Sequence, residues 1–155
     1  MRICLALVLS AVVSATALVS TQSKAVRVRV QTELGDIVIE VDPIKAPITT
    51  ANFLKYVDGG HYDGGIFHRT VKMDNQPEST VKIEVIQAGV NPDKAKSGFP
   101  AIALERTNAT GILHKDGVVS MARGAPDSAT SGWFICVNDA IELRVRVANM
   151  PAPPY

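Results

Sequence analysis

The chain has 155 residues, of which 16 are basic, 15 are acidic and 46% are hydrophobic, and its formal net charge is +1. This length suits one domain better than two, and the balance of residues suits an ordinary globular protein. The near-neutral charge, without a basic patch, disfavours nucleic acid as a partner.

The first 25 residues differ from the rest. Arg2 precedes a run of 17 apolar and small residues, Ile3 to Val19, and Ser23 and Ala25 then place small side chains where a signal peptidase reads them. The run is shorter than the ~20 residues that span a bilayer. We therefore expect residues 1–25 to be a cleaved signal peptide, leaving a periplasmic or secreted protein without stable membrane insertion. An uncleaved membrane anchor is the alternative.

The two cysteines carry little further information about the compartment. Cys4 lies in the expected signal peptide, so Cys136 would be the only thiol after cleavage and no internal disulfide could form. Cys136 lies in an apolar run, and we expect it to be a buried structural residue.

The start of the remaining chain predicts a hairpin and then a helix. Apolar residues alternate with polar ones over 26–31 and again over 37–41, with a turn at 33–36, which indicates two half-buried strands. A stripe near the helical period predicts a helix over 48–57, with Pro47 in its first turn.

Short apolar segments separated by polar loops follow to the end of the domain. They predict strands over 66–71, 81–86, 117–121 and 133–137, with loops over 72–80, 91–98 and 124–132. Many short strands and one good helix indicate a mainly β, mostly antiparallel domain, either a barrel or a sandwich.

The residues considered singly do not identify the chemistry. His61, His68 and His114 lack the close spacing of a zinc motif, so no metal site is expected. No G-x-S-x-G nucleophile motif is present either.

Ordered sequence blocks are more informative than single residues. They comprise Ala46, Pro47, Thr49, Asn52 and Phe53; Tyr62-Asp63-Gly64-Gly65 with Phe67-His68-Arg69; Val85 to Gly89; Leu113-His114; Gly117 to Arg123; and Ser128 to Ile135. In this order and over residues 26–139 they resemble the cyclophilin family of peptidyl-prolyl cis/trans isomerases. The resemblance implies a closed, eight-stranded antiparallel β-barrel with two capping helices.

The resemblance also implies an activity, rotation about X–Pro peptide bonds in extracytoplasmic proteins to assist folding, with neither metal nor cofactor. Arg69 matches the family's catalytic arginine, which favours the twisted state of the bond by hydrogen-bonding the prolyl nitrogen. The implied partners are proline-containing polypeptides, with cyclosporin-type ligands as a further class.

Substrate-binding roles are implied for six more residues. Gln87 matches the glutamine that orients the arginine and the substrate carbonyl, and Phe134 matches an aromatic wall of the proline pocket. Ala122 and Arg123 match the groove edge that binds the residues before proline, His68 flanks the arginine, and Val85 stands where the family has a methionine.

Two departures from the family pattern bear on function. Glu84 stands where the family usually has a pocket phenylalanine. Residues 140–155 match none of the family's closing elements, and we expect them to be a divergent tail that leaves the barrel incomplete at its C-terminus. The alternatives to an active isomerase are therefore a proline-binding or chaperone-like module without turnover and a truncated fragment without function.

Overall fold

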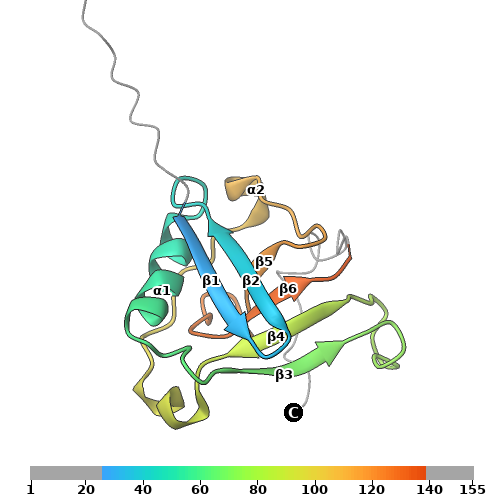
Figure 1. Ribbon diagram of the computed structural model, residues 1–155. Coiled ribbons are helices and arrows are strands. Elements are labelled where there is room, and N and C mark those ends of the chain that lie inside the picture. Colours follow the sequence, from blue (N-terminus) through green and yellow to red (C-terminus); the bar gives the residue numbers. More distant parts are fainter. Residues whose placement is uncertain (1–25, 139–155) are drawn as a thin grey trace, which may run out of the picture.

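A computed structural model describes residues 26–138 of the chain (Figure 1). The expected signal peptide at 1–25 and the expected tail at 140–155 lie outside the described residues. The described part contains β1 (Val26–Thr32), β2 (Gly35–Val41), α1 (Pro47–Asp58), β3 (Ile66–Val71), β4 (Val85–Gly89), the 3-10 helix η1 (Pro92–Ser97), α2 (Thr107–Thr110), β5 (Val119–Met121) and β6 (Trp133–Cys136).

The strands form two antiparallel sheets, a hairpin of β1 and β2 and a four-stranded sheet in the order β3-β4-β6-β5. The prediction of a mainly β, antiparallel domain with few helices is confirmed. Of the helices within residues 26–138, none has both the length and the apolar character needed to cross a membrane.

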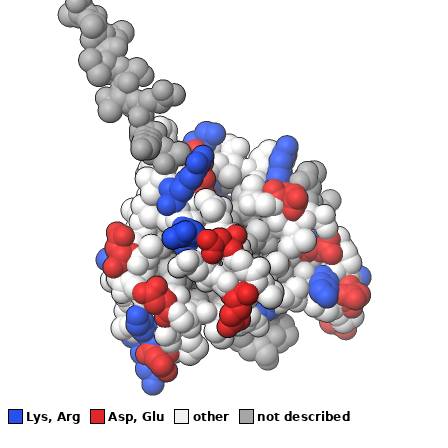
Figure 2. All heavy atoms as spheres, viewed as in Figure 1, with Lys and Arg blue, Asp and Glu red and all other residues white. Residues whose placement is uncertain are grey.

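The hairpin follows the alternation in its sequence. Val28 pairs with Ile39, and both pack toward the core, whereas the neighbouring Arg27 and Glu40 form an exposed ion pair of 2.9 Å. Exposed pairs of this kind contribute little to stability, so the buried side of the hairpin holds it in place. Basic and acidic side chains are interspersed over the face of the molecule shown in Figure 2.

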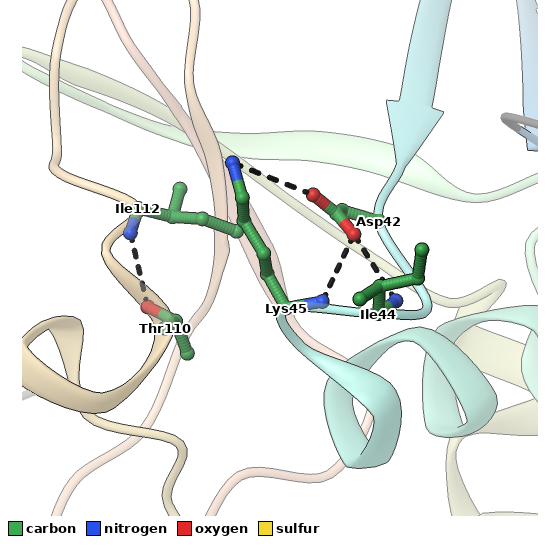
Figure 3. A network of polar contacts seen from close by, with 5 residues as sticks. All are labelled: Asp42, Ile44, Lys45, Thr110 and Ile112. Atoms are coloured by element: carbon green, nitrogen blue, oxygen red, sulfur yellow. Dashed lines mark hydrogen bonds and ion pairs between the residues drawn. The ribbon is translucent and has the colours of Figure 1, made fainter. Parts of the chain in front are cut away.

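The turn between β2 and α1 is fixed by a single carboxylate. Oδ1 of Asp42 accepts hydrogen bonds from the backbone N–H groups of Ile44 (3.1 Å) and Lys45 (2.9 Å), and the Lys45 ammonium lies 3.9 Å from Oδ2 (Figure 3). An aspartate in this arrangement replaces the backbone partners that a turn leaves free. It directs the chain from the hairpin into the helix.

The N-terminus of α1 is capped by a residue distant in sequence. Ala46 at the N-cap position has no side chain that could accept a hydrogen bond, and Pro47 begins the helix. The carboxylate of Glu105 instead accepts the backbone N–H groups of Ile48 (3.0 Å) and Thr49 (2.7 Å). An acidic group at this end of a helix satisfies free donors and complements the helix dipole.

The main core lies between one face of the four-stranded sheet and the layer formed by the hairpin and α1. Its buried members come from four different elements: Ile39, Phe53, Ala88 and Trp133. The Trp133 ring meets the Phe53 ring edge-on, with the centroids 6.2 Å apart. This core occupies one face of the sheet, and the other face carries a smaller core of Val71, Val85 and Cys136.

The predicted elements differ from the structure in two places. The strand expected over 81–86 begins only at Val85, so residues 81–84 lie outside β4. The loop expected over 91–98 contains the 3-10 helix η1. The hairpin, the helix and the strands near 66–71, 117–121 and 133–137 are confirmed, with small shifts of their ends.

Candidate functional site

Four side chains form a row across the second face of the four-stranded sheet. Arg69 on β3 is directly opposite Gln87 on β4, Gln87 is opposite Phe134 on β6, and Phe134 is opposite Ser120 on β5. Directly opposite residues of an antiparallel pair point to the same face. Arg69, Gln87 and Phe134, which were expected on separate strands, are therefore brought into one line.

The guanidinium and the amide of this row are within reach of each other. Nη1 of Arg69 lies 3.5 Å from Oε1 of Gln87, which is a long contact between exposed side chains. A guanidinium presents five N–H donors, so engaging one of them leaves others free to bind a further acceptor.

A β-bulge at His68 places Arg69 on this face. Phe67 is opposite Ala88 and Arg69 is opposite Gln87, so His68 is an extra residue without a partner on β4. The Phe67 ring points toward the core and meets Trp133 edge-on at 5.6 Å. Regular alternation would put Phe67 and Arg69 on the same face, and the extra residue separates them.

His68 itself is exposed, and its ring lies beside Gly89. A Cβ atom built on Gly89 would be 3.4 Å from Cε1 of the histidine. The absence of a side chain at Gly89 therefore leaves room for the His68 ring at the edge of the row.

His114 supports the aromatic member of the row. Its ring lies nearly parallel to Phe134, with the centroids 6.0 Å apart and 15° between the planes, and Nε2 is 3.1 Å from Oγ of Ser120. Burial lowers the pKa of His114, and the nearby Arg123 lowers it further. A neutral imidazole stacked on Phe134 and bonded to Ser120 restricts how Phe134 can move.

The loop before β6 is held by residues of the helical motif and of the Tyr62 block. Nδ2 of the buried Asn52 donates to the Thr130 carbonyl (2.6 Å), and the Tyr62 hydroxyl donates to the Ser131 carbonyl (2.7 Å). These bonds link α1 and the turn before β3 to the start of β6. They give Asn52 and Tyr62 a physical role in positioning Phe134.

Ala122 and Arg123 lie beyond the other edge of the row. The Ala122 N–H donates to the Gly132 carbonyl (2.8 Å), which ties the end of β5 to the start of β6. Arg123 is partly buried and donates to the Gly124 carbonyl (3.2 Å). Burial lowers the pKa of Arg123, Arg106 lowers it further, and Asp127 acts in the opposite direction.

A cavity of about 210 Å³ adjoins this edge. Phe134, His114, Ser120 and Arg123 are among its lining residues, together with apolar side chains such as Leu104. Arg69 and Gln87 are not part of the lining. Phe134 therefore lies between the exposed Arg69–Gln87 pair on one side and the cavity on the other.

Val85 is buried rather than exposed on the row. Only 3% of its surface is accessible, and it forms a small core with Val71 and Cys136, on which Phe134 packs. Cys136 is fully buried, as expected, and burial raises the pKa of its thiol to about 11. Val85 would therefore act on a ligand only indirectly, because it belongs to the core against which Phe134 packs.

Glu84 does not present an apolar surface. Its carboxylate accepts a hydrogen bond from the side-chain amide of Asn138, and its backbone carbonyl accepts the Val137 N–H (2.9 Å). The position that the family usually fills with a phenylalanine is thus occupied by a polar tie to the segment after β6.

Ser120 and His114 belong to the site although neither was assigned a role there from sequence. The pairing of β5 with β6 places Ser120 beside Phe134, and His114 contacts both of these residues, which no local pattern reveals. Within residues 26–138, no three His, Cys, Asp or Glu side chains are grouped so that they could hold a metal ion. A cation, an amide and an aromatic ring in one line suit a polar peptide group next to an apolar ring.

Comparison with known proteins gives a consistent family. The family model described as cyclophilin type peptidyl-prolyl cis-trans isomerase matches residues 27–148. The chain is 39% identical over 114 residues to peptidyl-prolyl cis-trans isomerase cyp18 of Streptomyces antibioticus, covering 72% of this chain and 62% of that protein. It is 37% identical over 128 residues to a peptidyl-prolyl cis-trans isomerase of Acinetobacter baylyi, covering 82% and 60%. The chain thus spans less than two thirds of the length of these relatives.

Solved structures share the fold. A crystal structure of a Cryptosporidium parvum cyclophilin type peptidyl-prolyl cis-trans isomerase superimposes with a TM-score of 0.61 at 24% identity, covering 77% of this chain and 72% of that one. The structure of that protein in the presence of the dipeptide Ala-Pro gives the same TM-score at 25% identity, with 76% and 71% covered.

Proposed function

Because the chain belongs to the family of cyclophilin type peptidyl-prolyl cis-trans isomerases, we propose that it catalyses rotation about X–Pro peptide bonds. The observation that supports this most is the row of directly opposite residues. Arg69, Gln87 and Phe134 come from three strands and lie on one face of the sheet. This row combines hydrogen-bond donors with an apolar surface at the place where a prolyl residue would bind.

The chemistry requires no covalent intermediate. The peptide bond resists rotation by about 18–20 kcal/mol because its C–N bond is partly double. In the twisted state that conjugation is lost and the prolyl nitrogen regains a lone pair. A donor that bonds this lone pair stabilises the twisted state more than either planar state, and this difference is what accelerates a reaction. Arg69 would supply that donor.

The other two members of the row would orient the substrate. Gln87, whose Oε1 lies 3.5 Å from the guanidinium, would restrict the orientation of Arg69, and its NH₂ would remain available to a substrate carbonyl. Phe134 would provide an apolar surface for the pyrrolidine ring. Its position is supported by His114 on one side and by the core of Val71, Val85 and Cys136 on the other.

The location of the activity is part of the same proposal. The apolar run near the N-terminus supports an extracytoplasmic site of action, where the enzyme would assist the folding of proline-containing polypeptides. Cyclosporin-type ligands would compete for the row. Mass spectrometry of the protein recovered from its host would test the location, and a chain that still begins at Met1 would contradict signal cleavage.

Replacing Arg69 tests the activity. We expect Arg69→Ala in the full chain to lower kcat/KM for a proline peptide by about 10²–10³-fold, the loss that follows removal of one donor aimed at a transition state. Arg69→Lys should recover little of this loss, because a lysine lacks the planar arrangement of donors. Arg27→Ala is the matched control, since Arg27 is an exposed arginine on β1 away from the row.

The readout is isomerisation of a proline peptide followed by exchange NMR, with the fold of each variant checked by its melting curve. Equal activity of Arg69→Ala and the wild-type chain would contradict the proposal. Binding of the peptide by a folded wild-type chain without turnover would instead support a proline-binding module, the alternative to which the polar Glu84 points.

A further inference from the structure

Ile83 is a partly exposed apolar residue next to the row. It precedes β4 by two residues and packs, together with Phe134, against the buried core of Val71, Val85 and Cys136. Val71 is two residues beyond Arg69 on β3, so it lies on the same face at a distance of about 7 Å along the strand. The residues that continue the row on this side are therefore apolar and buried, and Ile83 is a partly exposed residue that packs on them.

The backbone of Ile83 is fixed by one side chain. Nε2 of Gln76 donates to the carbonyls of Ile83 (2.7 Å) and Lys72 (2.6 Å), and Oε1 of Gln76 accepts the Ile83 N–H (3.2 Å). The amide thus satisfies both backbone groups of Ile83, as a neighbouring strand would do. Gln76 also links Ile83 to the end of β3, so it sets the position of Ile83 relative to Arg69.

The other end of this loop is held separately. Oδ1 of Asn75 accepts the Lys72 N–H (2.7 Å), and its Nδ2 donates to the Thr70 carbonyl (2.9 Å). These bonds shape the turn after β3 without any contact to Ile83. Gln76 is therefore the residue within this loop that connects the turn to Ile83.

We propose that Ile83 forms, together with Phe134, the apolar surface that receives the prolyl ring, and that Gln76 is the positioning residue that holds Ile83 there. The inference rests on the proposed function and deepens it. A pyrrolidine ring whose nitrogen faces Arg69 needs apolar contacts on the same face, and Glu84 cannot supply them because its carboxylate is bonded to Asn138. Phe134 and Ile83 can supply them, since both rest on the same core.

A direct test observes peptide binding by the wild-type chain. The chain is labelled with ¹³C at isoleucine δ1-methyl groups and titrated with a peptide that contains Ala-Pro. We expect the Ile83 methyl signal, assigned with Ile83→Leu, to shift with peptide concentration. The Ile39 methyl should not shift, because Ile39 is buried in the core on the opposite face of the sheet. Peptide binding that leaves the Ile83 signal unchanged would overturn the inference.

Steady-state kinetics test both residues. The loss of apolar contact in Ile83→Ala should raise KM by about 10-fold or more and leave kcat nearly unchanged, whereas Ile83→Leu should stay close to wild type. Gln76→Met keeps the size of the side chain but not its bonds, so it should raise KM in the same direction. Glu78→Ala, an exposed change in the same loop, is the control.

The outcomes distinguish this inference from the proposed function. A loss of activity in Arg69→Ala with an unchanged KM in both Ile83→Ala and Gln76→Met would refute the inference and leave the function intact. A wild-type chain that neither binds nor turns over proline peptides would refute both. If Ile83→Ala does not fold, the methyl titration of the wild-type chain still decides.

Discussion

The carboxylate that caps α1 should be a measurable source of stability. Glu105 accepts two backbone N–H groups, those of Ile48 and Thr49, and Ala46 cannot replace it as a cap. Helix caps contribute about 0.5–2 kcal/mol, and a charge near a helix N-terminus adds about 0.3–1 kcal/mol. Ile48 is 44% exposed, so water can solvate its N–H after the substitution, which favours the lower half of the summed range.

We therefore expect Glu105→Ala to lower the free energy of unfolding by about 1–2 kcal/mol. Glu105→Gln retains an acceptor oxygen but loses the charge, and it should cost about half as much. A domain of this size should then melt roughly 3–8 °C lower with alanine at this position.

Urea denaturation followed by the fluorescence of Trp133 measures this directly, because Trp133 is the only tryptophan and is buried. Glu78→Gln is the matched control, since it removes the same charge from an exposed loop. If Glu105→Ala and Glu78→Gln had the same unfolding free energy, the two short hydrogen bonds to α1 would have no energetic role and the reasoning would fail.

Two further predictions concern buried titratable groups. The pKa of His114 is lowered below 6.5 in the folded chain, so the unfolded chain binds a proton more readily. The free energy of unfolding should therefore fall as the pH drops below about 6.5. His114→Gln should reduce this slope, and a slope unchanged by this substitution would argue against the effect of burial. The pKa of the Cys136 thiol is raised to about 11, so in a Cys4→Ser chain it should resist a thiol reagent at pH 8 until urea unfolds the protein. Rapid reaction of the folded chain would contradict its burial.

Patterns confined to a few neighbouring residues predicted much of the fold. The alternation in β1 and β2 and the apolar stripe of α1 express contacts that these elements make with one core, so their period is visible in the sequence. Alternation was misleading at the start of β4. Val81 and Ile83 continue its pattern, but the partner of this backbone is the side chain of Gln76 rather than another strand.

The site could be predicted only through family resemblance, and then only in part. Arg69, Gln87 and Phe134 match family positions, yet their common face depends on strand pairing and on the bulge at His68. Contacts between residues far apart in sequence leave no local pattern. The cap of α1 by Glu105 is one example, since Glu105 is 56 positions after Thr49 in the sequence.

The bulge also constrains how this strand can change in evolution or in design. A strand has two faces, and each residue belongs to one of them according to whether its position is odd or even. The extra His68 shifts that parity between Phe67 and Arg69, so one short segment carries a partly exposed aromatic ring that contacts Trp133 on one face and an exposed cation on the other. Deleting His68 would make Phe67 and Arg69 consecutive, and regular alternation would still place them on opposite faces, whereas regular pairing of all three residues would put both on one face. A graft of the three-residue motif onto another sheet must therefore keep the bulge, because only the bulge separates the phenylalanine from the arginine when the histidine is retained.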